Sequence, residues 1–577
     1  MKKILYIIAA IAALTFSASC SQERLEIPQK GVIDYDDFYN GSTESALSAA
    51  TSCYQAAGMV LTLGAGFSIG IQNWCIAKSY YVLSNAPSDD SYYGSGYPTD
   101  HVFGIEINEY RPSFNGNSTV IRHVYSSCYM LIHDCNLLTD NYEYGSDELI
   151  NRSLSEARFF RAWAHFILAT YWGTPPMVDH LLTGAERPEN SNHDELMAWC
   201  AQELEDCAKY LPSKSGLNDK ANAVRVTKEA ALAMAGKVHV YAGNYEKAKT
   251  DLKAVIDSKK YDLVSGERMS ELFHRQEDAC EEKVLELNYI DYPGGVSGFG
   301  GHSHGQANES CFWRDLKAFP SNIIQHVGWG GGGNPSQSFV DAIRANEGDS
   351  YRRKAWIISY DELIGDCDYS QIPELKGATK EEKLMSSLLG LKEDVPSYYA
   401  NCGWFSLKYA PRYAELGENT ETGTDQNNVI MRYAEVLLLY AEACAWSSDD
   451  GSGLAALNKV QTRAGAPTTS LTKENVKNEK RFELYLEGSR WADLVRWGDA
   501  ATVLKDQYKT VPNFRDEFYE NGKPSGKPHH AVPAPSDTYY NNVTEYGFKA
   551  GKNELMPFPH AELVINEALQ QNPGWDR

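Results

Sequence analysis

The sequence predicts a mainly α-helical protein whose scaffold consists of paired helices. Three observations lead to this prediction. Apolar residues recur at helical spacing in several long segments, glycine or proline closes these segments, and one segment has the pattern of a tetratricopeptide hairpin. By length alone, the 577 residues would be enough for several domains.

The N-terminus has the three parts of a secretory signal. Two lysines precede an apolar run over residues 4–14, and small residues from Ser17 onward lead to Cys20. We predict a signal peptide over residues 1–19 and a lipidated Cys20 as the mature N-terminus, within a tether over residues 20–30. The pattern resembles a bacterial lipobox, although Ser17 stands where leucine is usual. The alternative is ordinary secretion with an incidental cysteine.

The composition disfavours some partners and favours others. The net charge of -23 argues against nucleic acid and anionic lipid surfaces, because both repel a strongly negative protein. Aromatic residues make up 12% of the chain, with 36 tyrosines and 12 tryptophans, more than its core requires. Some rings are therefore expected on the surface, where they suit stacking on sugars or contacts with proteins. No stretch after the signal approaches the roughly 20 apolar residues of a membrane-spanning helix.

The cysteines do not form a recognisable disulfide or zinc framework. Of the twelve, eleven follow Cys20, and none belongs to a CxxC pair. Cys128 and Cys135 are seven residues apart, as are Cys200 and Cys207. On a helix, this spacing leaves each pair about 10 Å apart, which is beyond disulfide reach. We predict buried single thiols, with one or two disulfides as the alternative.

The first strong helical segments lie in the N-terminal half. A helix is expected around Val120 to Asn136. The next runs from Ser155 to Trp172, with Ser155 as its N-cap and Gly173 at its end. A third, amphipathic segment extends from His193 to Leu211.

Residues Lys228 to Ser258 carry the clearest local pattern. Two helical segments meet at Gly243. Small residues such as Gly236 and Ala248, and bulky ones such as Leu252, stand where a tetratricopeptide unit has them. The small residues let paired helices approach closely. A generic pair of antiparallel helices is the alternative.

A second helical block is expected over residues 427–497. An apolar stripe that includes Ile430 runs from Asn427 to Trp446, and further helices cover Leu454 to Thr462 and Lys473 to Gly488.

The region between the blocks has a different character. From about residue 289 to 413 it is rich in glycine and aromatic residues and weakly periodic, which indicates functional loops. A short strand is expected near Val284 to Tyr289. Roughly the last fifty residues are expected to form an ordered wrap over the helices, because they contain several prolines and little periodicity.

Four segments resemble the SusD/RagB family, the surface glycan-binding lipoproteins of Bacteroidetes. They are EARFFRAWAHFILATYWGTPPMVD (156–179), MRYAEVLLLYAEA followed by LNKVQTRAGAP (431–467), NEKRFELYLEGSRWADLVRWG (478–498) and NELMPFPHAELVINEALQQNPGW (553–575). Lys480 and Gln461 each replace an arginine of the family pattern. The acidic run that favours surface display in such bacteria is reduced to Glu23.

The resemblance implies a SusD-like single domain over residues 31–577. Tetratricopeptide-like helices at about 120–260 and 427–497 would form its scaffold, and a loop-rich insert at about 289–413 would form its ligand-binding face. It also implies a partner, a SusC-type TonB-dependent transporter, which the lipoprotein covers at the cell outer membrane on the exterior side. No cofactor and no catalysis follow from the family.

Sugar recognition requires aromatic platforms and planar hydrogen-bonding side chains, and two segments supply them. The first, residues 86–97, resembles the Ser-Asp segment near which the family often places ligand contacts. The second is the glycine-rich stretch that includes residues 312–329. The candidate ligand-binding residues are Trp74, Asp90, Tyr92, Tyr93, Trp313 and Trp329. Burial in the core or contact with the transporter is the alternative for these rings.

The charged residues near the end of the second block have a structural interpretation. Arg490, Asp493 and Arg496 follow Glu487 at intervals of three residues. This spacing favours ion pairs that tie helices together over a charged active site.

Signs of catalysis or metal binding are weak. His302 and His304 could ligate a metal from an extended segment, but the sequence fixes no further ligand, so no metal site is predicted. Asp89, Asp90 or Glu309 could supply the carboxylate pair of a glycoside hydrolase. The sequence contains no P-loop or HExxH motif.

These observations predict a non-enzymatic surface protein that captures oligosaccharides or polysaccharide and passes them to a SusC-type transporter. The alternative in another class is a glycoside hydrolase or lyase with carboxylates on the tyrosine-rich loops. A further alternative is a transporter lid whose cargo is peptide or glycoprotein.

Overall fold

The computed structural model describes residues 38–61, 79–94, 102–288, 333–359, 362, 398–410, 426–448, 450–516, 519–520, 523–524, 531–535 and 545–577. Most of these residues are helical, and the strands are short, as the sequence predicts. Within the described ranges, no helix is both long and apolar enough to cross a membrane.

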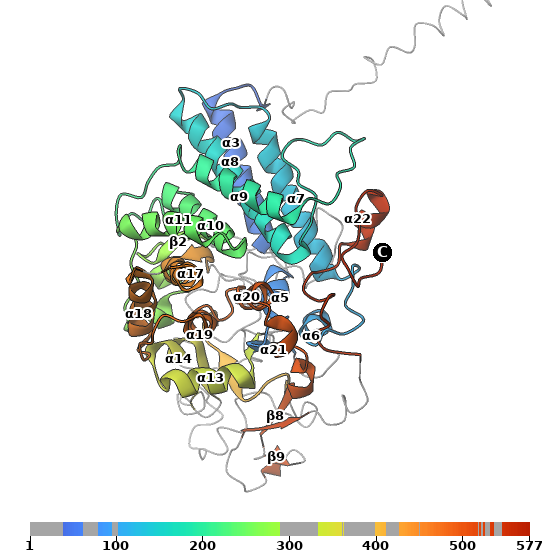
Figure 1. The fold of residues 1–577 in the computed structure, drawn as a ribbon, viewed down its shortest axis with the longest axis vertical. Coiled ribbons are helices and arrows are strands. Elements are labelled where there is room, and N and C mark those ends of the chain that lie inside the picture. Colours follow the sequence, from blue (N-terminus) through green and yellow to red (C-terminus); the bar gives the residue numbers. More distant parts are fainter. Residues whose placement is uncertain are drawn as a thin grey trace, which may run out of the picture.

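A continuous stack of helices forms the scaffold (Figure 1). Its members are α3 (Thr43–Leu61), α7 (Thr119–Thr139), α8 (Glu148–Trp172), α9 (His193–Cys207), α10 (Lys228–Tyr241), α11 (Tyr245–Asp257), α17 (Tyr433–Trp446), α18 (Ser452–Ala464) and α19 (Lys473–Glu483). From α7 to α11 each helix packs on the next, and α11 packs on α17. The two helical blocks predicted from the sequence therefore meet directly, although a long segment separates them in the chain. One apolar core runs through both.

Helix α8 begins earlier than the sequence predicted. Its N-cap is Asp147, whose Oδ1 accepts hydrogen bonds from the backbone N–H groups of Leu149 at 2.8 Å and Ile150 at 3.2 Å. The prediction of Ser155 as N-cap was wrong, because Ser155 lies buried inside the helix with its hydroxyl 3.1 Å from that of Tyr144. The side chain of Asp147 satisfies free N–H groups at the true start of the helix. The prediction began two turns later, because it relied on the apolar residues that follow Ser155.

The predicted tetratricopeptide-like hairpin is confirmed in α10 and α11. Gly243 makes the turn between them with φ +72°, a conformation that glycine adopts readily. Gly236 of α10 faces Leu252 of α11, and a Cβ atom at Gly236 would lie 2.5 Å from Cγ of Leu252. The missing side chain allows the close packing of the two helices.

The start of the second block differs from the prediction. Residues 428–432 form strand β7 (Asn428–Arg432), which pairs antiparallel with β2 (Lys283–Leu287), the strand expected near Val284. Ile430 therefore lies in a strand and not on the stripe of α17. Its apolar spacing suits a helix locally, but pairing with a strand about 145 residues away decides the conformation. Helix α19 ends at Glu483, five residues before the predicted Gly488.

The segment predicted as loops over 289–413 contains regular structure in its described parts. Helices α13 (Gln337–Glu347) and α14 (Tyr351–Trp356) lead into β4 (Ile357–Ser359), which pairs with β6 (Trp404–Ser406). These elements enclose a second apolar core around Trp356, which is completely buried. The prediction of loop throughout was therefore wrong for residues 337–359. Residues 289–332 and 363–397 lie outside the described ranges.

Short elements complete the described fold. The helices are α5 (Ser79–Asn85), α6 (Val102–Asn108), α20 (Arg490–Trp497), α21 (Ala500–Val503) and α22 (His560–Ile565), with 3-10 turns at Gly266–Glu271, Arg275–Glu277 and Gln507–Thr510. The strands are β1 (Ser91–Tyr92) with β3 (Asn334–Pro335), β8 (Pro512–Asp516) between β5 (Tyr398–Tyr399) and β11 (Ala531–Pro535), and β9 (Tyr519–Glu520) with β10 (Lys523–Pro524).

Residues 545–577 wrap over the helices as predicted. The indole N–H of Trp172, at the end of α8, donates to the carbonyl of Pro557 at 2.8 Å. The backbone N–H of Met556 donates to the carbonyl of Tyr171 at 2.8 Å. Asn572 reaches back to the same helix end, where its amide donates to the carbonyl of Trp172 at 2.9 Å. The C-terminal segment thus caps α8 with specific hydrogen bonds.

The described cysteines are buried single thiols, as predicted. They are Cys53, Cys128, Cys135, Cys200, Cys207, Cys280, Cys402 and Cys444. Burial raises the pKa of the Cys280 and Cys402 thiols to about 12, which keeps them protonated and unreactive at neutral pH.

Candidate functional site

The predicted ligand-binding residues fall into two groups. Trp74, Trp313 and Trp329 lie outside the described residues, as do the anchor Cys20 and the pair His302 and His304. Glu309 is outside them as well. Asp90, Tyr92 and Tyr93 are described, and they lie together on and beside strand β1.

Tyr92 and Tyr93 are packed into the protein, with 2% and 0% of their surface exposed. Tyr92 belongs to a small apolar cluster with Ile105, Ala400 and Val511. Tyr93 packs so closely on α6 that a Cβ atom at Gly104 would lie 2.9 Å from its ring. Both rings are thus buried in the protein, and this burial holds the 86–94 segment in place. Their contact with a ligand stays a prediction.

Asp89 and Asp90 are held by two arginines from the C-terminal half of the chain. Arg490 donates to Asp89 at 2.8 Å and Arg481 donates to Asp90 at 2.6 Å. Burial acts to raise the pKa of Asp89, but Arg490 and Arg481 outweigh it and hold that pKa well below its usual range. Burial raises the pKa of Asp90, with Arg481 opposing the shift. These carboxyls serve to fasten the 86–93 segment to α19 and α20.

The charged residues of α20 form an internal network, as the spacing predicted. Glu442 of α17 accepts from Lys480 at 2.8 Å and from Arg496 at 2.5 Å, while Asp493 pairs with the same two cations at 2.8 and 2.7 Å. The indole N–H of Trp497 also donates to Glu442 at 2.8 Å. Burial opposes ionisation of Glu442, but Arg496 and Lys480 dominate and lower its pKa to about 2. This quartet ties α17, α19 and α20 together.

A second buried network surrounds Arg432, which is completely buried at the end of β7. Its guanidinium donates to Glu282 at 2.9 Å, to Glu483 at 2.7 Å and to Glu487 at 2.6 Å. Glu487, which the sequence grouped with the α20 charges, thus serves this network. Lys408 also donates to Glu487, at 2.5 Å, and burial lowers its pKa to about 7. Sequence spacing gave no sign of this network, because its members come from four distant segments.

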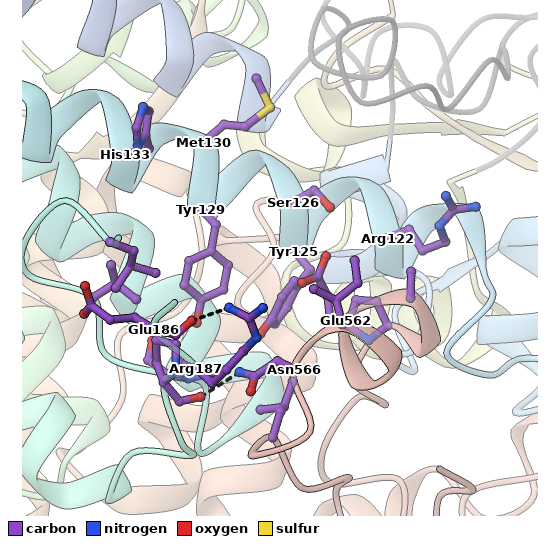
Figure 2. A pocket seen from close by; sticks show the side chains of 18 of the residues that line it. Arg122, Tyr125, Ser126, Tyr129, Met130, His133, Glu186, Arg187, Glu562 and Asn566 are labelled. Atoms are coloured by element: carbon purple, nitrogen blue, oxygen red, sulfur yellow. Dashed lines mark hydrogen bonds between the residues drawn. The ribbon is translucent and has the colours of Figure 1, made fainter. Parts of the chain in front are cut away.

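A cavity of about 640 Å³ opens between α7, the 176–188 loop and α22 (Figure 2). Its wall combines aromatic, apolar and polar side chains. They are Arg122, Tyr125, Ser126, Tyr129, Met130, His133, Asp134, Pro176, Val178, Leu182, Glu186, Arg187, Pro188, Pro559, Ala561, Glu562, Ile565, Asn566 and Leu569. The volume lies in the range of small-ligand sites. The sequence gave no sign of the cavity, because three separate segments build it.

Hydrogen bonds fix the wall of this cavity. Tyr129 donates from α7 to the carbonyl of Pro176 at 2.7 Å, and Asn566 donates to the carbonyl of Pro188 at 2.7 Å. Figure 2 shows Tyr125 and Tyr129 projecting from α7 toward Arg187. Burial raises the pKa of Glu562. Aromatic faces beside an amide, a guanidinium and a carboxyl can receive the apolar face and the hydroxyls of a sugar.

Two groups of described side chains could hold a metal ion. Glu277, Cys280 and Glu281 form the first, but Arg268 already donates to Glu281 at 2.6 Å and to Glu277 at 2.7 Å. The guanidinium supplies the positive charge that a metal would bring. The second group, Glu205, His239 and Asp251, has no such cation between its members and is considered below.

Two family models match the chain over separate segments. Residues 373–575 match the model described as "SusD family". Residues 88–240 match the model described as "Starch-binding associating with outer membrane". Together they cover more than half of the chain, and they include α7, α8, α9 and nearly all of α10 on one side of the 289–332 segment and α17, α18 and α19 on the other.

Individual relatives agree with these models. A "SusD-like protein" of Bacteroides ovatus is 22% identical over 99% of this chain and 98% of its own length. "SusD-like protein P2" of Formosa agariphila is 22% identical over 82% of this chain and 83% of its own length.

Solved structures show the same fold. "Surface glycan-binding protein A from Bacteroides thetaiotaomicron in complex with laminarihexaose" has a TM-score of 0.66 at 20% identity, over 92% of this chain and 99% of its own. A "Laminarin binding SusD-like protein" has a TM-score of 0.65 at 22% identity, over 93% and 100%. The helical architecture is therefore shared along nearly the whole chain.

Proposed function

Because the chain belongs to the SusD/RagB family, we propose that it is a non-enzymatic glycan-binding protein of the cell outer membrane. One observation carries this proposal. A chain that matches the starch-binding family model shares its fold with proteins whose names record laminarin binding and a laminarihexaose complex. Oligosaccharide or polysaccharide is accordingly the proposed ligand.

The proposed cellular role follows the family pattern. The signal peptide over residues 1–19 directs export, and lipidation of Cys20 anchors the domain over residues 31–577 at the outer membrane, facing the exterior. The tether leaves the domain free to move beside its partner. That partner is a SusC-like TonB-dependent transporter, to which the captured glycan passes.

Two locations for the ligand are proposed and ranked. The first is the set of predicted tryptophans, Trp313 and Trp329 in the loop-rich insert together with Trp74, whose flat rings would stack on sugar faces. The second is the cavity beside Tyr129, which has the volume and the mixed wall of a sugar site. The first location ranks higher, because Trp329 is flanked by glycines, which offer no side chains to cover an indole ring.

The state of the described acidic residues supports binding over hydrolysis. A glycosidase needs two carboxyls that flank the scissile bond and remain available to it. Asp89 and Asp90 are instead engaged by Arg490 and Arg481. These two residues are therefore not available as a catalytic pair, and Glu309, the third candidate, lies outside the described residues. The alternative of peptide or glycoprotein cargo is addressed by the choice of ligands below.

The experiment is calorimetry of the mature chain with laminarihexaose, other oligosaccharides and a peptide mixture. We expect glycan binding, and we expect Trp313→Ala and Trp329→Ala to weaken it by roughly tenfold each, about 1.4 kcal/mol. Arg187→Ala in the cavity tests the second location, and Tyr210→Ala, on an exposed tyrosine near α9, is the control. Release of shorter sugars from the glycan would contradict a non-enzymatic role, and binding of peptide alone would contradict a glycan ligand.

A further inference from the structure

Three successive helices of the scaffold bring an imidazole and two carboxyls to one point. Glu205 comes from α9, His239 from α10 and Asp251 from α11. Nε2 of His239 lies 2.8 Å from Oε1 of Glu205 and 3.8 Å from Oδ2 of Asp251. One potential ligand atom from each residue falls within 4.8 Å of the other two. The cluster lies in the stack of helices α9, α10 and α11.

The cluster is buried and incompletely satisfied. The side chain of His239 is 3% exposed, and that of Asp251 is 12% exposed. Oδ2 of Asp251 is inaccessible to solvent and has no hydrogen-bond partner, although it faces the imidazole. A buried carboxylate oxygen without a donor is costly, and a second carboxylate close by adds repulsion.

Burial shifts the pKa of two members of the cluster. It lowers the pKa of His239, which keeps the imidazole neutral. Nε2 donates to Glu205 in this structure, so a metal at Nε2 would require the ring proton to move to Nδ1. Burial and then Glu205 raise the pKa of Asp251 to about 7, with Lys247 opposing the shift. A divalent cation placed between the two carboxylates would offset their mutual repulsion and give Oδ2 of Asp251 a partner.

We propose that Glu205, His239 and Asp251 bind one divalent transition-metal ion, of which zinc is the reference case. Zinc takes imidazole nitrogen and carboxylate oxygen at about 2.1 Å, which puts tetrahedral ligand atoms about 3.4 Å apart. The observed separations of 2.8 and 3.8 Å from the imidazole nitrogen bracket that value. Small rotations of the two carboxyls would close the site. Glu205 is 31% exposed, so this side admits the ion and a water as fourth ligand.

The expected affinity is moderate. Nδ1 of His239 is buried without a hydrogen-bond partner, whereas metal-binding histidines usually donate from their other nitrogen to an acceptor. The absence of that support lowers affinity by roughly tenfold to a hundredfold. We therefore expect micromolar binding. The bound ion would join α9, α10 and α11 and stabilise the hairpin stack.

The test is calorimetry of the mature chain with zinc chloride, after removal of metals with a chelator. We expect one ion per chain, and a rise in melting temperature with zinc concentration because the ion binds the folded state. Asp251→Asn keeps the shape of the side chain and should weaken binding by at least about tenfold. His239→Gln should do the same. The control is Asp257→Asn, which removes an exposed carboxyl from the same helix α11.

A second control tests whether zinc binds at another position on the chain. The double variant His302→Gln and His304→Gln removes the only H-x-H motif of the sequence. Zinc binding that survives this change but falls in Asp251→Asn supports the proposal. Absence of binding to the wild-type chain, or equal affinity in Asp251→Asn, would overturn it. Circular dichroism checks that each variant is folded, and no glycan takes part, so the outcome is independent of the glycan-binding proposal.

Discussion

The buried charge quartet offers the sharpest test of how the scaffold is held together. In Glu442→Gln, the side chain keeps its size but loses its charge, and Lys480 and Arg496 are left with Asp493 as their one remaining anion within the quartet. The new amide group would also direct an N–H toward donors of Lys480, Arg496 or Trp497. Both changes destabilise the contact of α17 with α19 and α20.

The size of the effect can be derived in two ways. The pKa of Glu442 falls from 4.5 to about 2 in the folded protein, and each pKa unit corresponds to about 1.4 kcal/mol, which gives about 3 kcal/mol at neutral pH. Independently, removal of one partner from a buried ion pair costs about 3 to 5 kcal/mol. We therefore expect Glu442→Gln to lower the free energy of unfolding by about 3 kcal/mol at pH 7.

The pH dependence has a definite sign. Because the folded-state pKa of Glu442 is depressed, its contribution is complete above the unfolded-state pKa of 4.5. It is lost as the pH falls toward 2. The difference between wild type and Glu442→Gln should thus shrink in acid, to about half by pH 3.

Urea unfolding followed by circular dichroism at pH 7, 5 and 3 measures this difference. The matched control is Glu474→Gln on the exposed side of α19, which should change stability by less than about 0.5 kcal/mol. The double variant Glu442→Gln with Lys480→Met removes one cation together with the anion, and should lose less stability than the sum of the single variants. A loss below about 1 kcal/mol at pH 7, or one that stays constant in acid, would refute the reasoning.

Three further changes test other parts of the scaffold. Gly236→Val should lower the free energy of unfolding by about 2 kcal/mol in chemical denaturation, because the added atoms overlap the buried Leu252. In the presence of a chelator, wild-type stability should fall between pH 4 and 7 as the raised pKa of Asp251 is passed, since protonation favours the folded state. Asp251→Asn should remove this loss and raise the free energy of unfolding by about 1 kcal/mol at pH 8. This expected gain is reduced because solvent screens the partly exposed carboxyl. Asn572→Ala should cost about 2 kcal/mol and speed proteolysis of the C-terminus, because two buried carbonyls, one of them from Trp172, lose their donor.

Each of these three predictions has an outcome that would contradict it. Gly184→Val, at a glycine with open space around it, is the control for packing, and an equal loss there would point to a general effect of valine. A stability difference between wild type and Asp251→Asn that does not change with pH would show that the carboxyl titrates normally. An unchanged proteolysis rate in Asn572→Ala would show that the C-terminal wrap is held by its apolar contacts.

Local sequence predicted the structure correctly where the contacts that determine it join residues close in the chain. The hairpin of α10 and α11 was predictable because Gly236, Gly243 and Leu252 lie within seventeen residues, so that the turn and the close contact between the two helices are both encoded locally. The repeated spacing on α20 likewise indicated ion pairs before their partners were known. The same reasoning failed at Ile430, whose apolar spacing suggested a helix although β2 makes it a strand. It also placed the start of α8 at Ser155, because the cap at Asp147 precedes the apolar run.

The candidate site was less predictable than the scaffold. The resemblance of segment 86–97 to the family's Ser-Asp segment made Tyr92 and Tyr93 ligand-binding candidates, yet both side chains are buried. No local signal distinguishes a tyrosine that faces a ligand from one that fills a core. The sequence analysis missed both the cavity beside Tyr129 and the cluster of Glu205, His239 and Asp251.

The sequence by itself determined the helical class, the hairpin and the family of the chain. These depend on periodicity, small residues at helix contacts and short motifs, all of which are local. Only the tertiary structure decided which arginines neutralise Asp89 and Asp90, which segments enclose the cavity, and that α9, α10 and α11 each bring one metal-binding group to a single point. Such sites join residues that are distant in the chain, and their positions follow from the packing of whole helices.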